Sequence, residues 1–588
     1  MRKTKIVATI GPATNDVEAI KRLIRAGMNT ARINFSHGTY ESHGETVGKL
    51  KAAREELGAP VALMLDTKGP EIRTKTFGTG SVSLKKGQDF VLTTEDVVGD
   101  ESRVSITYDD LADDLAVGSR ILFDDGLIEM RVVKINGGDI QCTVVNDGEL
   151  GSNKGINLPD SNVSLPSMTE KDIEDIKFGI RMDFDFLAAS FVRTPKDVLE
   201  IRRILEENGG GHMQIIAKIE NREGVENLES ILEVADGIMV ARGDMGVEIQ
   251  PEEVPLIQKK MIKKANVAGK PVITATQMLE SMVNNPRPTR AEASDVANAI
   301  FDGTDAIMLS GETAMGSYPI ESVKMMDRIA RRTEESLDYA NNLSQGRSQN
   351  VINVTNAITY ATCSVAADLH AACIVTVTKS GFTGRMVSKY RPNCPILVVA
   401  TDERVWRRMA LVWGVEAVVT TMADSDKELF ETAGKCALET GLAKNGDIIV
   451  IVAGVPVGVT GTTNLMKVHV VGNILAKGRG IGKGVIIGKT AVIKPSEEAG
   501  RTFQEGDILV ASQTNDDMMD YIRKAGAVVV GTDQNLDNTH AKIACQALKK
   551  PLIICNERVI DLIHTGITVT IDCEAGFVYN GTIPENNK

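Results

Sequence analysis

The chain has 588 residues, and at roughly 150 residues per domain this length predicts about four domains. Lys and Arg total 66 against 79 Asp and Glu, so the formal net charge is −13, which disfavours binding to nucleic acid or to an anionic membrane. No apolar run approaches the ~18 residues that a membrane span needs. The first residues lead directly into a short apolar strand without a signal-peptide core, and the eight cysteines form no C-x-x-C pair. We therefore expect a cytoplasmic protein with reduced, buried cysteines.

From residue 1 to about 330, short apolar strands alternate with helical patterns. The expected strands are Lys5–Ile10, Thr30–Phe35, Val61–Asp66, Phe186–Phe191, Gln214–Ile219, Gly237–Ala241, Pro271–Thr276 and Ala306–Leu309. The clearest helical patterns are Asp16–Ala26, Pro195–Asn208, Pro255–Ala268 and Arg290–Phe301. This alternation predicts parallel strands joined by right-handed crossovers, and eight such units predict a (β/α)8 barrel.

The helical period disappears between about residues 74 and 158. Short strand-like pieces separated by Gly and Asp turns replace it, namely Ser81–Leu84, Phe90–Thr93, Arg120–Phe123, Met130–Ile135 and Gln141–Val145. We expect a small all-β domain inserted after the third barrel strand. An insertion at that point lies at the barrel mouth, where barrel enzymes carry out their chemistry, so a lid is the natural role.

The C-terminal part predicts two further domains. A charged helix (Ser322–Asn341), a polar linker (Asn342–Asn350) and a helix (Val351–Leu369) precede strands expected at Cys373–Thr378, Pro395–Ala400, Ala417–Thr420, Asp447–Ala453 and Val468–Val471. These predict an α/β domain with an open sheet. A Gly/Lys segment, Lys477–Gly484, then leads into a Val/Ile-rich region, 485–588. The expected boundaries are 1–73 and 159–341 for the barrel, 74–158 for the lid, 342–473 for the α/β domain and 474–588 for the last domain.

Charged residues recur at the carboxyl ends of the barrel strands, where barrel active sites lie. Lys218 and Glu220 share strand parity, so both point into the barrel mouth, and an inward lysine is costly unless it is paired. Glu220 and Asp244 come from adjacent strands and can converge. Two carboxylates beside a lysine and arginines suit a divalent hard cation and an anionic substrate; the alternative is a structural ion-pair network.

A second polar group follows the second and third strands and consists of Asn34, Ser36, Asp66 and Thr67. Its oxygens carry few formal charges, which suits a monovalent cation better than Mg²⁺. The alternative is hydrogen bonding that ties strand ends to loops, and the spacing leaves the two equally open.

Two hydroxyl residues follow the seventh strand. Thr276 at the strand end is either a proton relay or a helix cap, and spacing alone favours the cap. Thr289, within Pro286–Arg290, is expected to be the N-cap of the next helix.

A possible anion site follows the first strand of the second α/β domain. Its backbone N–H groups, hydroxyls and lysine come from Thr378, Lys379, Ser380, Gly381 and Thr383, where a helix is expected to begin. The alternative is an ordinary capped helix start.

Five segments together resemble the pyruvate kinase family: Arg32–Gly38, Asp66–Arg73, Ile216–Asn221, Ala275–Met282 and Met308–Thr313. The resemblance covers about residues 1–473 in unbroken order. It implies transfer of the phosphoryl group of phosphoenolpyruvate to ADP, which gives pyruvate and ATP in the last step of glycolysis. It also implies a homotetramer.

The resemblance implies roles for individual residues of the barrel mouth. Glu220 and Asp244 would hold Mg²⁺ or Mn²⁺, while Lys218 and Arg32 would stabilise charge on the transferring phosphoryl group. The residues implied to contact phosphoenolpyruvate are Arg32, Lys218, Gly243, Asp244, Thr276 and Ser310. Thr276 is also the implied relay that brings a proton to the enolate.

Other implied roles concern potassium and ADP. The implied K⁺ ligands are Asn34, Ser36, Asp66 and Thr67. Glu71 marks the potassium-dependent type of the family, and an extra carboxylate there favours a monovalent counter-charge. The implied ADP contacts are His37, Arg73 and Lys154, joined by Asp125 when the lid closes.

The loop from Thr378 to Thr383 resembles the allosteric phosphate site of the family. Its partner loop, Ala453–Asn464, contains no Lys or Arg, and a bisphosphate would need a cation for its second phosphate. We therefore expect a monophosphate activator, such as a sugar monophosphate or AMP.

The tail exceeds the common length of the family. Glu505–Val510 and Asn538–Ala541 resemble the swivelling phosphohistidine domain of phosphoenolpyruvate-utilising enzymes, and His540 stands where the phosphorylated histidine would be. However, Asp533–Thr539 replaces the usual glycine-rich Ser-His context. We therefore expect a structural or interface domain rather than a phosphorylated His540.

Two other functions stay open from the sequence. A metal-dependent lyase would need a similar metal pair but no ADP site or lid, so Glu71, Arg73 and the insertion argue against it. A non-catalytic phosphohistidine carrier or scaffold would have lost its catalytic positions, yet Lys218 and Thr276 are present. Because a fold does not imply a function, neither alternative is excluded by fold alone.

Overall fold

The computed structural model describes residues 1–159, 161, 163–349, 353–421, 425–454, 463–472, 474–493, 503–531 and 539–582. Two compact units make up the chain. The first comprises Met1–Ala367, Thr376–Met422 and Val452–Leu465, and the second comprises Asp368–Val375, Ala423–Ile451 and Met466–Lys588.

Eight parallel strands close into a barrel in the order β1-β17-β16-β15-β14-β13-β3-β2. Their bounds are β1 Lys5–Thr9, β2 Thr30–Asn34, β3 Ala62–Asp66, β13 Phe186–Ala189, β14 Gln214–Ile219, β15 Gly237–Ala241, β16 Val272–Ala275 and β17 Ala306–Leu309. Each of the eight strands expected from the sequence is present, with ends that differ by at most two residues. The prediction of a (β/α)8 barrel is confirmed.

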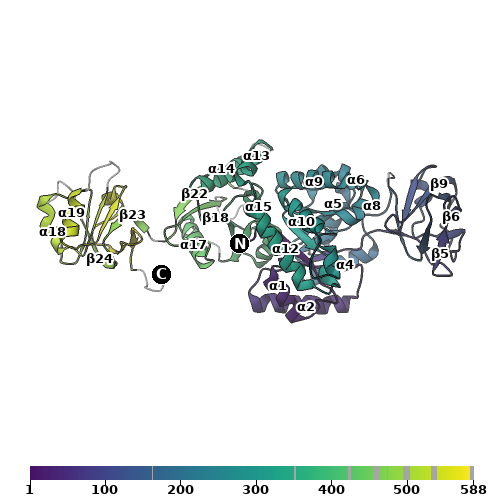
Figure 1. The fold of residues 1–588 in the computed structure, drawn as a ribbon, viewed down its shortest axis with the longest axis horizontal. Coiled ribbons are helices and arrows are strands. Elements are labelled where there is room, and N and C mark those ends of the chain that lie inside the picture. Colours follow the sequence, from purple (N-terminus) through teal and green to yellow (C-terminus); the bar gives the residue numbers. More distant parts are fainter. Residues whose placement is uncertain are drawn as a thin grey trace. The chain divides into compact units, whose positions relative to one another are not determined.

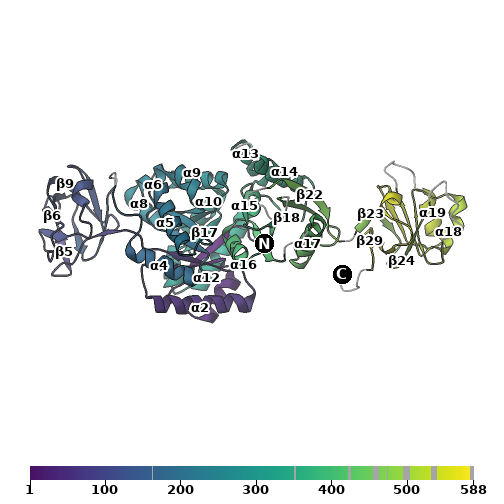
Figure 2. The ribbon, with the colours of Figure 1, turned by 180° about the vertical axis from the view of Figure 1, so that it is seen from behind.

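Helices surround this barrel (Figures 1 and 2). They are α1 Val17–Ala26, α2 Tyr40–Leu57, α4 Glu170–Arg181, α5 Pro195–Glu207, α6 Arg222–Glu226, α7 Leu228–Val234, α8 Arg242–Glu248, α9 Val254–Ala268, η1 Glu280–Val283, α10 Arg290–Phe301, α11 Gly311–Ala314 and α12 Pro319–Glu334. Thr289 is the N-cap of α10, and its side chain accepts a hydrogen bond from the backbone of Glu292 in a capping box. The predicted cap is therefore confirmed, and it satisfies N–H groups that the first helical turn leaves unpaired.

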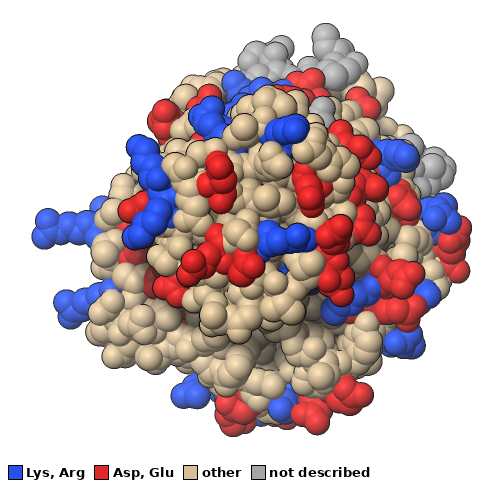
Figure 3. Space-filling model, turned by 90° about the vertical axis from the view of Figure 1, so that its right-hand side faces the viewer, with Lys and Arg blue, Asp and Glu red and all other residues tan. Residues whose placement is uncertain are grey.

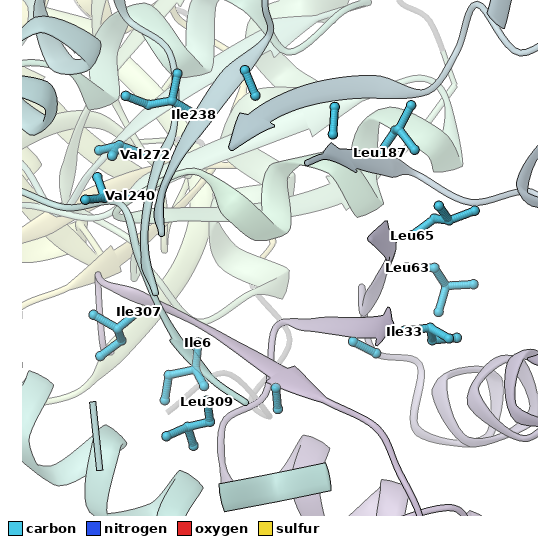
Figure 4. Packing of buried hydrophobic residues seen from close by; sticks show 14 of the residues in the cluster. Ile6, Ile33, Leu63, Leu65, Leu187, Ile238, Val240, Val272, Ile307 and Leu309 are labelled. Atoms are coloured by element: carbon cyan, nitrogen blue, oxygen red, sulfur yellow. The ribbon is translucent and has the colours of Figure 1, made fainter. Parts of the chain in front are cut away.

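The barrel strands carry apolar side chains on both faces. Outward residues such as Ile33, Leu65 and Ile307 pack against the helices (Figure 4). Inward residues such as Met64 and Ile216 form a second cluster inside the barrel. Because side chains alternate along a strand, the inward parity of β3 and β14 continues to Asp66 and Lys218 at the carboxyl end. The apolar filling thus ends where the polar site begins.

The insertion between β3 and β13 is an all-β domain with a short helix. A sheet in the order β4-β12-β8-β9-β10-β6-β7 is accompanied by the pair β11-β5. The bounds are β4 Ile72–Arg73, β5 Ser81–Leu84, β6 Asp89–Thr93, β7 Arg103–Ser105, α3 Leu111–Asp114, β8 Arg120–Phe123, β9 Ile128–Asn136, β10 Asp139–Val144, β11 Gly148–Gly151 and β12 Gly155–Asn157. The sequence missed β4, β7 and β12, because segments of two or three residues show no readable alternation, and it missed β11, which begins and ends with glycine.

An open five-stranded sheet follows, in the order β20-β19-β18-β21-β22. Its elements are α13 Tyr339–Gln349, α14 Val354–Asp368, β18 Cys373–Thr378, α15 Phe382–Ser388, β19 Ile396–Ala400, α16 Glu403–Arg408, η2 Met409–Leu411, β20 Val415–Val419, α17 Asp426–Glu439, β21 Ile448–Ala453 and β22 Leu465–Val470. The expected polar linker at Asn342–Asn350 is wrong as far as Gln349, because α13 covers it. The carboxylate of Asp338 accepts the backbone N–H of Asn341 at 3.0 Å, so it caps a new helix after α12 ends.

The last part of the chain closes into a second, smaller barrel in the order β23-β27-β26-β25-β24-β28-β29. Its elements are β23 Ile474–Ile481, β24 Val485–Ile493, β25 Ile508–Ala511, η4 Asp516–Met518, α18 Met519–Lys524, β26 Ala527–Gly531, α19 Thr539–Ala547, β27 Leu552–Cys555, α20 Val559–Leu562, β28 Thr568–Asp572 and β29 Phe577–Asn580.

Part of the Gly/Lys segment expected to lead into this region is the strand β23. A Cβ on Gly478 would lie 2.3 Å from the carbonyl oxygen of Ile554, and one on Gly480 would lie 1.8 Å from that of Cys573. The glycines therefore permit close contact between the strands of a small barrel.

No helix among the described residues has the length and apolar character to span a membrane. Seven of the eight cysteines are buried, as expected, and Cys394 is half-buried. On the face drawn in Figure 3, the described Lys and Arg side chains are interspersed with Asp and Glu. This distribution agrees with the net negative charge, which disfavours binding to a phosphate backbone.

Candidate active site

Lys218 lies at the centre of the polar group in the barrel mouth. Its Nζ is 2.9 Å from Oε1 of Glu220 and 3.2 Å from Oδ1 of Asp66. It also donates a hydrogen bond to Oγ of Ser190 at 2.7 Å. The three acceptors come from the ends of β14, β3 and β13, so the closed barrel brings together residues far apart in sequence. The sequence predicted that Lys218 and Glu220 both point into the barrel mouth but did not predict this contact between them.

The charge on Lys218 is held by its neighbours. Burial favours the neutral amine, but the carboxylates of Asp66 and Glu220 outweigh this effect and raise the pKa of Lys218. Its side chain is only 12% exposed. The amine is therefore a permanent cation at the barrel mouth, and it can stabilise negative charge that develops on a substrate.

Glu220 shows the opposite effect. Its side chain is almost fully buried and accepts the backbone N–H of Phe191 at 2.5 Å. Burial, with added repulsion from Asp244, raises the pKa of Glu220 to about 7 although Lys218 opposes the shift. Asp244 lies in the first turn of α8, directly after the neighbouring strand β15. A bound cation would offset both the burial and the repulsion.

These two carboxylates fit a magnesium or manganese ion. Mg²⁺ is commonly held by one or two protein carboxylates, while substrate oxygens and water complete its coordination. Among the residues that the structure describes, no cluster of three or more His, Cys, Asp or Glu forms a closed metal cage. With Glu220 and Asp244 as its two protein ligands, such an ion would keep positions for substrate oxygens and water.

Arg32 and Asp66 form an ion pair beside Lys218. Arg32 Nε is 2.5 Å from Oδ2 of Asp66, and its Nη1 donates to Oγ1 of Thr9 at 3.0 Å. Burial alone would raise the pKa of Asp66, but Arg32 and Lys218 lower it. Arg32 is thus fixed next to Lys218, and the two cations together suit an anionic substrate.

The four oxygen-bearing residues expected to bind a monovalent cation lie at the ends of β2 and β3. Asn34 and Asp66 are paired across the two strands, and Oδ1 of Asn34 accepts the backbone N–H of Ser36 at 3.1 Å. Oγ1 of Thr67 accepts the backbone N–H of Ser190 at 3.2 Å. Because Asp66 already has two cationic partners, this group offers largely neutral oxygens. That chemistry fits K⁺ rather than a divalent ion.

Glu71 has cationic partners of its own. Its Oε2 lies 2.6 Å from Nη2 of Arg73 and 3.7 Å from Nζ of Lys68. The counter-charge that the sequence led us to expect from potassium is therefore supplied in part by these two side chains.

The backbone at Thr276 is strained. Thr276 has φ 65° and Gln277 has φ 53°, a region that is rare for a β-branched residue. Oγ1 of Thr276 donates to the carbonyl of Ala275 at 2.7 Å and accepts the N–H of Gly243 at 2.8 Å. Thr276 does not cap the helical turn that follows it; its hydroxyl binds an N–H in the first turn of α8. The strain marks a position that its surroundings must hold in place.

Arg242 supplies that hold. Its Nη2 donates to the carbonyl of Thr276 at 2.6 Å, and its Nε donates to that of Ala275 at 3.1 Å. Its Nη1 binds the carboxylate of Asp295, at 2.6 and 2.8 Å from the two oxygens. Arg242 on α8 therefore connects the end of β16 to α10.

Ser310, at the end of β17, is held by a buried carboxyl group. Glu312 accepts the N–H of Ser310 at 2.8 Å and that of Leu279 at 3.1 Å. Burial raises the pKa of Glu312. This contact fixes the end of the eighth strand to the loop after the seventh.

A cavity of about 580 Å³ lies between the barrel mouth and the inserted domain. Its lining includes Arg73, Asp125, Lys154 and Asp244, four of the residues that the sequence assigned to the site. His37 is exposed and does not line this cavity. The cavity is large enough for a nucleotide.

The sequence missed several neighbours of the site. Ser190, which contacts Lys218, and Phe191, whose N–H binds Glu220, follow the fourth barrel strand, and neither is charged. Both lie within the strand expected at Phe186–Phe191, at the end where barrel chemistry occurs, but nothing in their residue types singled them out. The long-range link from Arg242 to Asp295 left no signal in the sequence, because the two residues are far apart along the chain.

The loop after β18, expected from the sequence to be either an anion site or a capped helix start, makes a turn at Gly381. Gly381 has φ 76°, and its N–H donates to Oγ1 of Thr378 at 3.1 Å. The hydroxyl of buried Thr383 lies 3.0 Å from that of Thr463 at the end of the partner loop. Residues 455–462 of that loop lie outside the described residues.

His540 lies at the start of α19 in the C-terminal barrel. Its Nδ1 is 2.9 Å from Oγ1 of Thr514, and its Nε2 is 3.2 Å from Oδ1 of Asp516. Both ring nitrogens therefore have partners, and one of these is a carboxylate, which would repel a phosphoryl group on that nitrogen. Residues 532–538, which include most of the sequence context considered above, lie outside the described residues.

Three family models match separate parts of the chain. The model described as pyruvate kinase, barrel domain, matches residues 1–323, and the one described as pyruvate kinase, alpha/beta domain, matches residues 356–469. A third, the mobile domain of PEP-utilising enzymes, matches residues 503–576.

Full-length relatives and a solved structure agree with these matches. The chain is 52% identical to a pyruvate kinase of Geobacillus stearothermophilus over 582 residues and 50% identical to one of Bacillus licheniformis over 583, with 99% of both chains covered in each case. The crystal structure of a pyruvate kinase from Cryptosporidium parvum superposes with a TM-score of 0.77 at 41% identity, covering 80% of this chain and 96% of that one.

Proposed function

The chain belongs to the pyruvate kinase family, and from this premise we propose how its own residues transfer the phosphoryl group of phosphoenolpyruvate to ADP. As a member of that family it is a phosphotransferase that forms pyruvate and ATP. The observation that carries the residue-level proposal is the buried cation Lys218, held 2.9 Å from Glu220 and 3.2 Å from Asp66. Phosphoryl transfer depends chiefly on positioning and electrostatic stabilisation.

Lys218 and Arg32 stabilise the negative charge that spreads over the phosphoryl oxygens during transfer. Both cations are fixed before substrate arrives, because each is already bound to Asp66. Little reorganisation is then needed at the moment of reaction, which is the condition under which such charges are most effective.

Glu220 and Asp244 would hold the divalent ion, which when bound neutralises substrate charge and helps to orient the phosphoryl group. Gly243 and Asp244 at the start of α8 bind phosphoenolpyruvate beside Thr276, and Ser310 borders the same space. The hydroxyl of Thr276, oriented by Ala275 and Gly243, orders the water that brings a proton to the enolate.

The inserted domain acts as a lid over ADP. Arg73 and Lys154 provide positive charge for its phosphates, and Asp125 contacts it from the lid; all three line the cavity. His37 would reach ADP from the exposed loop after β2. Closing a lid excludes water, which would otherwise accept the phosphoryl group in place of ADP.

Pyruvate formation from phosphoenolpyruvate and ADP with Mg²⁺, measured with and without K⁺, tests the activity and the cation site together. We expect activity that rises with K⁺. Activity indifferent to K⁺ would leave the enzyme but reject K⁺ binding by Asn34, Ser36, Asp66 and Thr67. Absence of activity under all conditions, even with AMP or ribose 5-phosphate added, would favour the carrier or the lyase instead.

Glu71 is the residue proposed to make the enzyme potassium-dependent. The substitution Glu71→Lys places a fixed cation next to the oxygen group and should lower the dependence of kcat on K⁺ at least several-fold. Glu71→Gln, which removes the charge without supplying a cation, is the matched control and should not restore activity in the absence of K⁺. An unchanged K⁺ dependence in Glu71→Lys would contradict this role.

The activator proposed for the loop from Thr378 to Thr383 is a monophosphate. Support comes from the hydroxyl groups, Lys379 and the turn at Gly381, together with the lack of Lys and Arg in the partner loop. Titration with AMP, ribose 5-phosphate and fructose 1,6-bisphosphate compares the ligand classes. Activation by the bisphosphate alone would refute the proposal.

The remaining proposals concern assembly and the tail. The family resemblance supports a homotetramer that works in the cytoplasm. The C-terminal barrel is proposed to be a structural or interface domain, because His540 is bound by Thr514 and Asp516. Incubation with labelled phosphoenolpyruvate, followed by a search for acid-labile label on His540, tests this point; stoichiometric labelling would overturn it.

A further inference from the structure

The segment Val163–Leu165, which returns the chain from the inserted domain to the barrel, is attached to the insertion. Val163 and Leu165 pack against the apolar core of the inserted domain. Between them, the backbone N–H and the hydroxyl of Ser164 each donate to the carboxylate of Asp114, both at 2.9 Å. Tyr108 of the insertion also donates to Asp114, at 2.7 Å. This segment therefore moves with the insertion.

One side chain of the barrel binds the same segment on both sides of Ser164. Nη1 of Arg193 donates to the carbonyl of Val163 at 2.6 Å, and Nη2 donates to that of Leu165 at 2.5 Å. A guanidinium group presents its N–H donors in a rigid plane, so two such bonds fix an orientation as well as a distance.

The backbone of Arg193 is itself fixed to the barrel. It follows β13, its N–H donates to the carboxylate of Asp197 at 2.9 Å, and its carbonyl accepts from Asn227 at 3.0 Å. The link from barrel to insertion thus runs from β13 through the guanidinium to two carbonyl groups. The carboxylate of Asp114 binds the same short segment from the opposite domain.

We infer that Arg193 is a positioning residue for phosphoryl transfer, which sets the angle at which the inserted domain stands over the cavity by binding the carbonyls of Val163 and Leu165. This inference rests on the proposed role of the insertion as a lid. The ADP contacts Asp125 and Lys154 are carried by the insertion, whereas Lys218 and Asp244 belong to the barrel. A change in the angle would therefore separate ADP from the phosphoryl group without disturbing phosphoenolpyruvate.

Direct contact of Arg193 with ADP is the competing explanation, because Arg193 also lines the cavity. A variant of Asp114 distinguishes a role in setting the angle from direct contact with ADP. It holds the same segment from the side of the insertion, and it is not among the residues that line the cavity. A role in setting the angle predicts the same kinetic change in Arg193 and Asp114 variants, whereas direct contact predicts it for Arg193 alone.

The kinetic test uses the full-length enzyme with Arg193→Gln, Arg193→Lys and Asp114→Ala. We expect Arg193→Gln to raise KM for ADP about tenfold and to lower kcat several-fold, while the Kd for phosphoenolpyruvate, measured without ADP, changes less than twofold. Lysine cannot bind both carbonyls in one plane, so Arg193→Lys should fall between wild type and Arg193→Gln. Asp114→Ala should show the same separation between ADP and phosphoenolpyruvate.

Arg202→Gln is the matched control, because Arg202 on α5 also binds a backbone carbonyl, that of Val234 at 3.1 Å, and a carboxylate, that of Asp236 at 2.8 Å. Both of these partners belong to the barrel, so the substitution should leave KM and kcat unchanged. Equal losses for ADP and phosphoenolpyruvate in the Arg193 variants, or a normal KM for ADP in Asp114→Ala, would overturn the inference.

A distance measurement distinguishes failure of the inference from failure of the lid itself. Spin labels at Val133→Cys on β9 and Leu199→Cys on α5, both about half exposed in the native chain, report the separation of insertion and barrel once Cys394 is replaced by Ser. If the distance in the otherwise native enzyme does not change on addition of Mg²⁺ and ADP, the lid proposal fails. If it shortens, Arg193→Gln should broaden the ligand-free distribution, and a distribution unchanged from that of the native Arg193 would reject the inference.

Discussion

A single residue, Lys218, shows why the barrel mouth favours phosphoryl transfer over a passive ion-pair network. A passive network would neutralise each charge within itself, but here the pKa of Glu220 stays raised, to about 7, through burial and repulsion from Asp244. Three carboxylates, those of Asp66, Glu220 and Asp244, lie around two cations, Lys218 and Arg32. One negative charge is therefore left for a further cation to balance. The site is therefore arranged for a further cation and for an anionic substrate.

Replacement of Lys218 should lower kcat much more than it changes the Kd for phosphoenolpyruvate. Lys218→Met removes the cation that stabilises the transferring group, and we expect kcat to fall at least about a hundredfold, as when an oxyanion-hole donor is removed. The Kd for phosphoenolpyruvate should change far less, because Arg32 and the start of α8 remain. Stopped-flow assays and direct binding measure the two quantities. Lys218→Arg keeps the charge and should retain more activity; full activity in Lys218→Met would remove Lys218 from the mechanism.

Sequence reasoning predicted charged and hydroxyl residues that follow most barrel strands, but it missed the neutral groups of Ser190 and Phe191 after the fourth strand. The parity rule placed Lys218 and Glu220 on the inward face of one strand, and in the structure their charged atoms lie 2.9 Å apart. Ser190 lies just as close to Lys218, but a serine after an apolar strand is too common to be singled out. The partners of Glu71, namely Arg73 and Lys68, were within reach of the sequence because they lie only two and three residues away.

At the scale of elements, side chains from α8 and α10 fix the strained backbone of Thr276 after β16. Arg242 on α8 binds the carbonyl of Thr276 and, through its other nitrogen, Asp295 on α10. A residue with positive φ costs of order 1–3 kcal/mol unless its surroundings compensate. The packing of α8 and α10 around the barrel is therefore part of the catalytic geometry, although the sequence predicted only α10 of these two helices.

The carboxylate of Asp295 should matter to activity more than to stability. In Asp295→Asn, Arg242 loses its charged partner, so the hold on Thr276 weakens, and we expect kcat to fall about tenfold, or 1.4 kcal/mol in activation free energy. Glu292→Gln on the same helix is the control. It disrupts the capping box with Thr289 and should cost about 1 kcal/mol of stability while kcat stays within twofold. Steady-state kinetics and urea unfolding measure both; equal kcat losses in the two variants would contradict the assignment to Asp295.

The predicted elements were most accurate where the chain repeats one pattern. Eight βα units reinforce one another, whereas a two-residue strand such as β4 is defined only by its partner β12. The sequence did not predict the strand β23, because glycine usually disfavours strands. Gly478 and Gly480 form a strand there because the backbones of Ile554 and Cys573 leave no room for a side chain. No local pattern in the sequence reveals this contact.

At the scale of the whole molecule, the first unit is held together by contacts that seal the barrel end opposite the active site. Ala410 and Leu411 of η2 join the apolar cluster inside the barrel. Around them, Arg391 binds Asp305 at 2.8 Å and Arg407 binds Asp185 at 2.7 Å, with every partner less than one-tenth exposed. Such pairs join residues 86 and 222 positions apart. The sequence predicted both domains but could not predict this junction.

Lys5 lies at this junction and should make stability depend on pH. Burial, with the nearby charge of Arg2, lowers the pKa of Lys5 from 10.5 to about 8, and its Nζ donates to the carbonyl of Val415 at 2.6 Å. Between pH 8 and 10.5 the unfolded chain keeps a proton that the folded chain has lost, so stability rises with pH there. As the pH falls from 10.5 to 8 this gain in stability disappears, and below pH 8 Lys5 is protonated in both states.

The comparison of wild type with Lys5→Met isolates this effect, because the lost hydrogen bond to Val415 contributes equally at every pH. We expect the free energy of unfolding of the wild type, relative to Lys5→Met, to rise by about 2–3 kcal/mol between pH 7 and pH 10. Urea unfolding at several pH values measures it. Lys196→Met, at an exposed position on α5, should give a difference that does not change with pH. If the difference in unfolding free energy between wild type and Lys5→Met also does not change with pH, the pKa of Lys5 is not lowered by folding. Water would then reach the amine at this junction.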